Sequence, residues 1–370
     1  MAHTLLGATL GHLAARGAPR ADDEPRERGI VLAGIVAANV PDVDALAYLA
    51  GSDFALGFRR GITHGVVAMA LWPLLLVALC AWWRSRGSGR SLLAQVTPRL
   101  LLVVALGCWS HPLLDWLNTY GIRLLMPFDQ RWFYGDVAFI VDPWMWLLLG
   151  GGLVLARSPG VRERRRWLVL ALICAGAVAA SPTPIGARLA WLVALLGVGL
   201  GVRSGGGARG RWPVAVALAL FVLYVGALTI VEREARRRVA DIAALGSSPH
   251  VISAARLMVG PRPLDPMTWQ VVVRLRDRYR IGSYRLGASG VRWQDPLPHG
   301  PGGPAVEGAW EDPAVAGFAR WVRFPYHRIV EEPEARFVYL LDARYATEPT
   351  TGFGGARIPA EGLGDREPPP

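Results

Sequence analysis

The chain has 370 residues, of which 52% are hydrophobic and 19% are charged. A soluble protein usually carries about 25% charged residues, and the apolar residues here fall in long blocks, so the composition excludes a purely soluble protein. The formal net charge of +11 does not indicate nucleic-acid binding, because the arginines cluster in short loops between apolar blocks instead of on one polar domain.

Eight apolar segments are candidate membrane helices. Four of them approach the roughly 20 residues needed to cross a bilayer core, and the first is short enough to be a buried or re-entrant helix instead. In chain order they are 3–15, 29–49, 62–83, 99–118, 137–156, 167–181, 187–202 and 212–231. The sequence therefore predicts an all-α polytopic membrane bundle of about eight helices, with a first part over 1–156 and further membrane helices over 157–231.

Arginine-rich loops give the orientation of these helices, because positive loops stay cytoplasmic. Loops 84–98, 157–166 and 203–211 carry such arginines and lie two spans apart. Loop 16–28 falls on the same side if both N-terminal runs span. We therefore expect a multi-pass protein of the inner (plasma) membrane, with both termini on the extracytoplasmic side.

The composition changes after Val231 to a polar region rich in Pro and Gly. Alternation of apolar and polar residues predicts strands, and one stretch, 313–322, is typical of a helix. The expected strands are 269–276, 279–281, 326–330 and 336–342. We expect a soluble α+β domain over 232–355 on the extracytoplasmic side, followed by a disordered tail over 356–370.

Ionisable residues in membrane segments are costly and mark functional sites. In this chain they all fall near the extracytoplasmic ends of the expected helices, although the orientation comes from arginine loops alone. They are His3, Asp42, Asp44, His64, His111, Asp115, Asp136 and Asp142. Their common level in the membrane predicts one shared site.

Spacing within this set favours a metal centre. His111 and Asp115 are four residues apart and project from one helix face, and Asp42 and Asp44 follow Pro41 at a helix end. Imidazole with carboxylate suits zinc, manganese or iron(II) better than calcium or magnesium. We expect a divalent metal, zinc first and manganese or iron as alternatives. The expected ligands are His3, Asp42, Asp44, His64, His111 and Asp115, with Asp136 as a further candidate.

Ordinary structural roles compete with this hypothesis at single positions. Asp42 could cap a helix, Asp142 precedes a proline and could be a turn residue, and Arg60 could anchor a lipid phosphate. His12 lies nine residues from His3, about half a turn out of phase, so we expect it outside the site.

An ordered set of motifs resembles the membrane-bound metal-dependent hydrolase family, also described as LexA-binding, inner-membrane-associated hydrolases. The motifs are His3-Thr4, Asn39-Val40-Pro41-Asp42-Val43-Asp44, Arg60-Gly61-Ile62-Thr63-His64, His111-Pro112-Leu113-Leu114-Asp115, Thr119-Tyr120-Gly121, Pro127-Phe128 and Phe139-Ile140-Val141-Asp142-Pro143. The likeness covers roughly 1–156 and implies a membrane metal site. Gly65 departs from it, since the family usually has Ser there. A spacing-only likeness to zinc-dependent phospholipase C and related single-strand nucleases suggests phosphoester chemistry.

These observations favour a metallohydrolase that acts on a lipid or cell-envelope phosphoester at the extracytoplasmic face, with membrane lipids as its surroundings. Asp42 or Asp44 would serve as general base, and Arg60 would hold a phosphate. Two alternatives stay open: a non-catalytic regulator or assembly factor with a structural metal, and a transporter with an Asp/His relay. The transporter ranks last because the sequence shows no internal repeat.

Reporter fusions test the orientation. A reporter after Arg90 or Arg164 should read cytoplasmic and one after Arg238 extracytoplasmic, because the arginine-rich loops fix the inner side. A cytoplasmic signal at Arg238 would contradict both the helix count and the shared face of the site.

Overall fold

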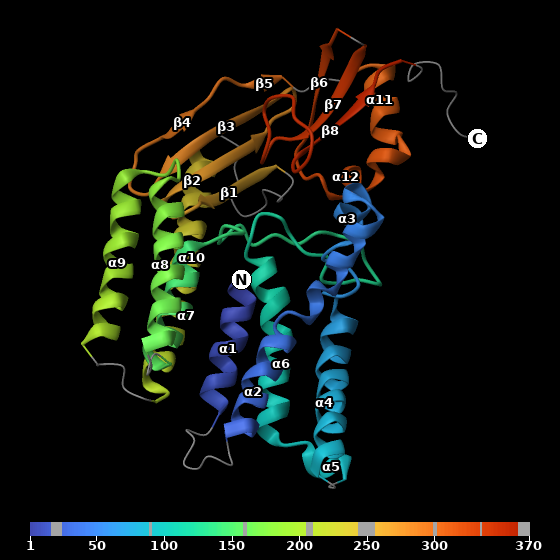
Figure 1. The fold of residues 1–370 in the computed structure, drawn as a ribbon. Coiled ribbons are helices and arrows are strands. Elements are labelled where there is room, and N and C mark those ends of the chain that lie inside the picture. The colour runs from blue at the N-terminus through green and yellow to red at the C-terminus, as the bar shows by residue number, and fades with distance from the viewer. Residues whose placement is uncertain are drawn as a thin grey trace. The chain divides into compact units, whose positions relative to one another are not determined.

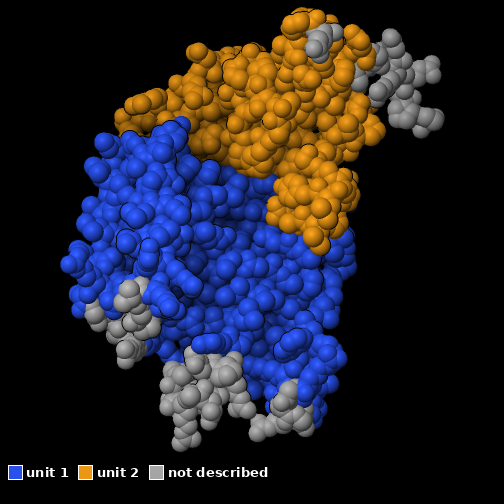
Figure 2. Space-filling view, in the orientation of Figure 1, with its two compact units in different colours: residues 1–43, 60–231, 261–266 blue, residues 44–59, 232–260, 267–370 orange. Residues whose placement is uncertain are grey.

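The computed structural model describes residues 1–15, 24–88, 91–157, 161–204, 210–242, 256–298, 302–333 and 335–361. The chain divides into two compact units (Figure 2). Unit 1 contains residues 1–43, 60–231 and 261–266, and unit 2 contains residues 44–59, 232–260 and 267–370. The main division falls after Val231, where the composition changes.

Unit 1 is built from helices. Its elements are α1 (Ala2–Ala14), α2 (Glu24–Ala37), the start of the 3-10 helix η2 (Val40–Ala50), α4 (Val66–Ser88), α5 (Leu92–Gln95), α6 (Pro98–Trp116), α7 (Pro143–Ala156), α8 (Val161–Ala179), α9 (Ile185–Arg203) and most of α10 (Trp212–Ile242). The start of α1, the start of α4 and the end of α6 lie at one end of these helices, beside the loop 117–142 (Figure 1). Helices α4, α7 and α9 finish at the opposite end, which is where arginine-rich loops follow them in the sequence.

Three helices of the described chain are long and apolar enough to cross a membrane: α4, α9 and α10. A fourth span is obtained if α2 and η2, which are bent by 50°, count as one broken span. The expected number of about eight is therefore not reached by length and composition. Helices α1 and α7 are short, with 13 and 14 residues. Helix α8 begins with a run of arginines, and α6 carries His111 and Asp115.

Glycines allow α1, α2 and α6 to pack backbone against backbone. A Cβ on Gly34 of α2 would lie 2.5 Å from the Gly7 carbonyl oxygen of α1, and one on Gly107 of α6 would lie 2.8 Å from the Ala37 Cβ. Distances under 3.0 Å are not tolerated without a shift. Small residues are the usual means of close helix approach in membranes, and here they bring the ends of three helices together.

Helix ends follow local capping rules. The Thr97 hydroxyl accepts a hydrogen bond from the Leu100 amide at 3.2 Å, and Pro98 occupies the first helical position of α6, which suits the fixed φ angle of proline. The Asp142 carboxylate caps α7 by accepting from the amides of Trp144 and Met145. It also accepts from the Tyr224 hydroxyl at 3.0 Å, so Asp142 has a structural role.

Unit 2 contains two antiparallel sheets, except that residues 261–266, at the turn between the first two strands, belong to unit 1. The first has the order β1-β2-β3-β4 with β5 paired to β3, and the second has the order β6-β7-β8. The strands are β1 (Leu257–Arg262), β2 (Asp265–Arg274), β3 (Arg278–Arg285), β4 (Val291–Trp293), β5 (Leu297–Pro298), β6 (Pro325–Glu331), β7 (Arg336–Asp342) and β8 (Gly355–Pro359). Val272 pairs with Ile281 in the first sheet and Ile329 with Val338 in the second. The C-terminal part is thus β-rich, and all four expected strands lie within it.

Three short helices complete unit 2: α3 (Ser52–Phe58), α11 (Pro304–Glu311) and α12 (Ala316–Trp321), the last preceded by a 3-10 turn at Pro313–Val315. Aromatic and aliphatic side chains of both sheets form the core, including Met258, Tyr279, Phe324 and Leu341. The expectation for 356–370 is corrected, because residues 356–359 belong to β8 and pair with β7. The remainder of that tail, 362–370, lies outside the described residues.

Substitution of the packed glycines tests the role of close helix contact. Gly34→Ala should lower the thermal unfolding midpoint of the full chain in detergent, since overpacking costs about 1–3 kcal/mol. Gly197→Ala on α9 is the matched control, because a Cβ there meets nothing within 4 Å and alanine favours a helix over glycine by about 1 kcal/mol. Equal midpoints for the two variants would contradict the proposed tight packing.

Candidate metal centre

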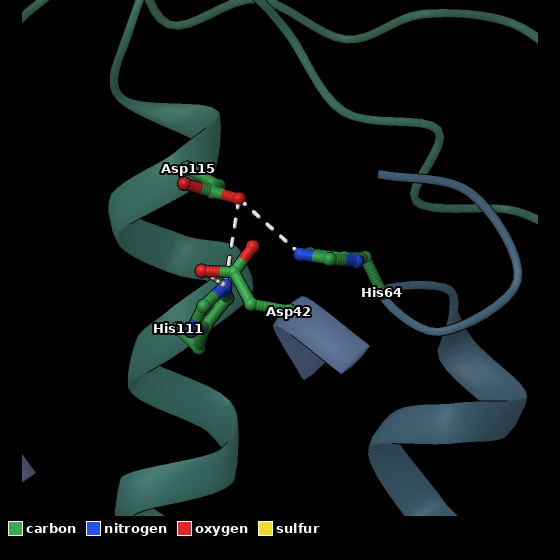
Figure 3. A group of neighbouring side chains, drawn as sticks. All are labelled: Asp42, His64, His111 and Asp115. Carbon is green, nitrogen blue, oxygen red and sulfur yellow. Dashed lines mark ion pairs between the residues drawn. The ribbon is translucent and has the colours of Figure 1, made fainter. Parts of the chain in front are cut away.

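Four side chains of unit 1 converge at one end of the helices: Asp42, His64, His111 and Asp115 (Figure 3). One ligand atom from each lies within 4.8 Å of the other three. Opposite ligands of one ion, with bonds of about 2.0–2.2 Å, lie at most about 4.4 Å apart. The largest distance among the four atoms therefore exceeds the largest ligand-to-ligand distance around a single ion by only a few tenths of an ångström.

His111 and Asp115 come from consecutive turns of α6, and their side chains project from the same face (Figure 3). The His111 Nε2 atom lies 3.6 Å from the Asp115 Oδ2 atom and 3.7 Å from the Asp42 Oδ2 atom. On the other side of the ring, Nδ1 lies 2.7 Å from the backbone oxygen of Ala38. A carbonyl oxygen only accepts, so Nδ1 donates this hydrogen bond and Nε2 is the ring nitrogen that faces the group.

The Ala38 carbonyl is available because α2 stops at Ala37. Pro41 has no amide hydrogen, so it cannot continue the hydrogen-bond ladder of α2. The Asn39 side chain donates to the Ile35 carbonyl at 2.7 Å and accepts from the Thr4 hydroxyl of α1 at 3.1 Å. This break turns the chain into η2, which begins at Val40 and presents Asp42 to the group.

His64 lies in the loop that precedes α4. Its Nε2 atom lies 3.3 Å from the Asp115 Oδ2 atom, and its Nδ1 atom lies 2.8 Å from the Thr63 hydroxyl. The Trp72 indole donates to the Thr63 carbonyl at 3.0 Å. A Cβ on Gly65 would lie 2.4 Å from the Met126 carbonyl oxygen, so the glycine that departs from the related family is the residue that this close loop contact requires.

Asp115 is the shared carboxylate of the centre, and it is almost fully buried. Its Oδ1 atom accepts from the Arg60 guanidinium at 2.9 Å, while Oδ2 faces the two histidines. The Arg60 guanidinium also donates to the Asn118 side chain at 2.9 Å and lies 4.4 Å from the Tyr120 ring centre. Arg60 thus orients Asp115, a contact that the sequence hypothesis of a phosphate-binding arginine did not include.

His3 lies beside the four-residue group. Its ring stacks on His111 with a centroid distance of 3.8 Å, and its Nε2 atom lies 3.4 Å from the Asp115 Oδ1 atom. His3 is therefore next to two members of the group, although the four closest ligand atoms do not include one of its own.

The donor set fits a divalent metal. Within the described part of the chain, the Nε2 atom of His111 and the Oδ2 atom of Asp115 are buried and make no hydrogen bond. Buried polar atoms normally have partners, and a cation held between these two atoms would give both of them one. Two imidazole nitrogens and two carboxylates are ligands typical of zinc, manganese or iron.

Other candidate residues lie outside the four-residue group. Asp44 is buried in unit 2, where it pairs with Arg59 at 3.3 Å. Asp136 is fully buried with a φ of 56° in the loop after α6. His12 is half-buried on α1 and does not belong to the group, as expected. Roles for Asp44 and Asp136 in metal binding stay predictions.

Sequence reasoning did not identify three groups that position the site: Asn118, the Thr4–Asn39 pair and the Ala38 carbonyl. Asn118 holds both Arg60 and the Tyr120 amide through one oxygen. Its position three residues after Asp115 of the His-x-x-x-Asp motif is the sequence feature that could have indicated its role. The Ala38 contact could not be found, because a backbone carbonyl has no sequence signature.

Comparisons with known proteins cover the part of the chain that contains this group. The YdjM inner membrane protein family matches residues 1–235, which include the whole centre. A stretch of 171 residues is 22% identical to the uncharacterized protein YfhP of Bacillus subtilis, covering 45% of this chain and 50% of YfhP. A stretch of 108 residues is 35% identical to the inner membrane protein YbcI of Escherichia coli, covering 28% of this chain and 57% of YbcI. The chain spans about half the length of these relatives. No solved structure matches it significantly.

Paired histidine substitutions test the centre. His111→Ala should reduce bound zinc or manganese, because it removes a nitrogen that faces Asp42 and Asp115. His12→Ala, in a neighbouring helix, should leave the metal content unchanged. Metal is measured on purified protein by mass spectrometry, with thermal unfolding as the folding control. Loss of metal from His12→Ala but not from His111→Ala would overturn the assignment.

Proposed function

The chain belongs to the YdjM inner membrane protein family, and we propose that it is a metal-dependent hydrolase embedded in the inner membrane. Its substrate would be a phosphoester of a lipid or cell-envelope molecule. The observation that carries this proposal is the convergence of Asp42, His64, His111 and Asp115 within 4.8 Å. A divalent metal held there would polarise the ester and lower the pKa of a bound water toward neutrality.

Asp42 is the member of the group best placed to handle a proton. Its side chain is 36% exposed, whereas those of His64, His111 and Asp115 are 0–4% exposed. An exposed carboxylate can reach both water and substrate, which a general base must do. Asp44 is the weaker candidate for this role, because its side chain is fully buried against Arg59.

Arg60 supports the reaction by holding Asp115. Two of its guanidinium nitrogens contact Asp115 and Asn118. A phosphate bound by Arg60 would therefore compete with these two residues for the guanidinium group. We therefore assign Arg60 a positioning role and keep direct phosphate contact as the secondary expectation. In metal centres, the ligating carboxylates are typically held in place by hydrogen bonds from neighbouring residues that do not bind the metal.

The arginine distribution supports an extracytoplasmic location of the centre. The helix ends that carry the centre lie opposite the ends followed by arginine-rich loops (Figure 1). Because such loops stay in the cytoplasm, we place the centre and both termini of this multi-pass chain on the outer side.

A structural metal is the second candidate function. Three of the four ligands are almost fully buried, and structural metal sites are closed whereas catalytic ones keep an open position. In that case the protein would be a non-catalytic regulator or assembly factor of the membrane. Both functions require the metal, so metal binding does not distinguish them. Substrate turnover does, because only the hydrolase would show it.

The hydrolase proposal is tested with the purified full chain loaded with zinc or manganese. We expect hydrolysis of chromogenic phosphodiesters, phosphomonoesters or phospholipids, and a decrease in kcat of about 10²-fold or more in Asp42→Asn, the usual contribution of a general base. Asp129→Asn is the control, because Asp129 pairs with Arg131 in the loop after α6 and lies outside the group. Tight metal binding without turnover on the whole panel would favour the structural function.

A further inference from the structure

Residues 43–62, called here the 43–62 segment, have an apolar surface. It contains the end of η2 and all of α3, and its most exposed large side chains are Leu49 at 87%, Leu46 at 64% and Phe54 at 53%. The Phe54 and Phe58 rings stack at 5.6 Å. The complete set of exposed large hydrophobic residues is Val43, Leu46, Tyr48, Leu49, Phe54, Phe58 and Ile62.

The charged side chains of the same segment are turned inward. Asp44 pairs with Arg59 at 3.3 Å. Asp53 accepts two hydrogen bonds of 2.8 Å from the amides of Gly317 and Phe318, at the start of α12.

The fourth charged residue, Arg60, pairs with Asp115 at 2.9 Å. A segment that faced water would place its charges outside and its large apolar side chains inside. The 43–62 segment has the reverse arrangement.

We propose that the 43–62 segment lies in the lipid interface, with its exposed apolar side chains in the acyl boundary of the outer leaflet. Contiguous exposed apolar surface marks contact with a protein partner or with a membrane. Here we infer the membrane, because the exposed apolar residues continue along the chain into candidate membrane spans on both sides of the segment. On one side, η2 is part of the bent pair that is apolar enough for a broken span. On the other, exposed apolar residues continue through Val66, Val67 and Leu71 into the candidate span α4.

The helices of the segment are too short to cross a bilayer. Helix η2 has 11 residues and α3 has seven, with Gly51 at a φ of 114° between them. A span requires about 20 residues, whereas an amphipathic element can lie in the plane of the interface with its apolar face buried by about 5–10 Å.

This placement adds a substrate class to the proposed function, and that addition rests on the proposed phosphoester hydrolysis. Asp42 of the metal centre immediately precedes the segment. Val43, which follows Asp42 in unit 1, is itself exposed. If Val43 contacts lipid, the centre opens at the level of the headgroups. The substrate class is then an amphiphile whose phosphoester headgroup reaches Asp42 while its chains stay in the leaflet.

Site-directed spin labelling of the full chain in lipid nanodiscs tests the placement without any turnover. Cys80, Cys108 and Cys174 are replaced by alanine, and the background is accepted only if its thermal midpoint is retained. Labels are then introduced by Leu49→Cys and Phe58→Cys, with Leu46→Cys and Phe54→Cys as substitutes for a variant that does not fold. Collision with apolar oxygen is compared with collision with a water-soluble nickel complex.

Leu74→Cys on α4 is the lipid-facing control, and Ile329→Cys on β6 is the water-facing control; both wild-type side chains are exposed. We expect the oxygen-to-nickel collision ratio at positions 49 and 58 to rise several-fold above that at 329, toward that at 74. A ratio equal to that at 329 would overturn the proposal. Labels shielded from both reagents, or broadened by coupling to a second copy, would assign the surface to protein contact and would also overturn it.

Discussion

The candidate metal centre depends on the close backbone approach of α1, α2 and α6. His3 comes from α1, Asp42 follows α2, and His111 and Asp115 lie on α6, so the distances between them are set by how closely these helices pack. Glycines at positions 7, 34 and 107 leave no room for a side chain at the contacts. Close contact compensates for the lack of a hydrophobic driving force between helices in lipid, and here it also determines where the ligands meet.

The break between α2 and η2 exposes backbone carbonyl groups that then form hydrogen bonds at the candidate centre. Ending a helix leaves carbonyl groups without helical partners, and such groups are expensive when buried. At this break the Ala38 carbonyl accepts from His111 and the Asn39 side chain donates to the Ile35 carbonyl. The same turn therefore satisfies the backbone, fixes the tautomer of one ligand and places Asp42.

Local patterns could be predicted from the sequence, but long-range contacts could not. The pairing of His111 with Asp115 follows from helical periodicity, and the common level of His64 and Asp42 follows from the arginine loops. The orientation of Arg60 could not be foreseen, because it depends on Asn118 in an irregular turn. Helix α3 lies between the expected helices 29–49 and 62–83, and no sequence pattern predicted the contact of its Asp53 with amides more than 260 positions away.

The charges around Asp115 are compatible with a cation bound at the candidate centre. A buried carboxylate is costly unless it is paired, and Arg60 satisfies only the Oδ1 side. The Oδ2 atom faces His64 and His111 at 3.3 and 3.6 Å without hydrogen-bond geometry at this atom. The Nδ1 atom of His111 is engaged by the Ala38 carbonyl, so Nε2 is the ring atom that faces Asp115 and could bind a metal ion. A cation bound there would balance the Asp115 carboxylate, and the Asp42 carboxylate, whose side chain is 36% exposed, could add a further ligand.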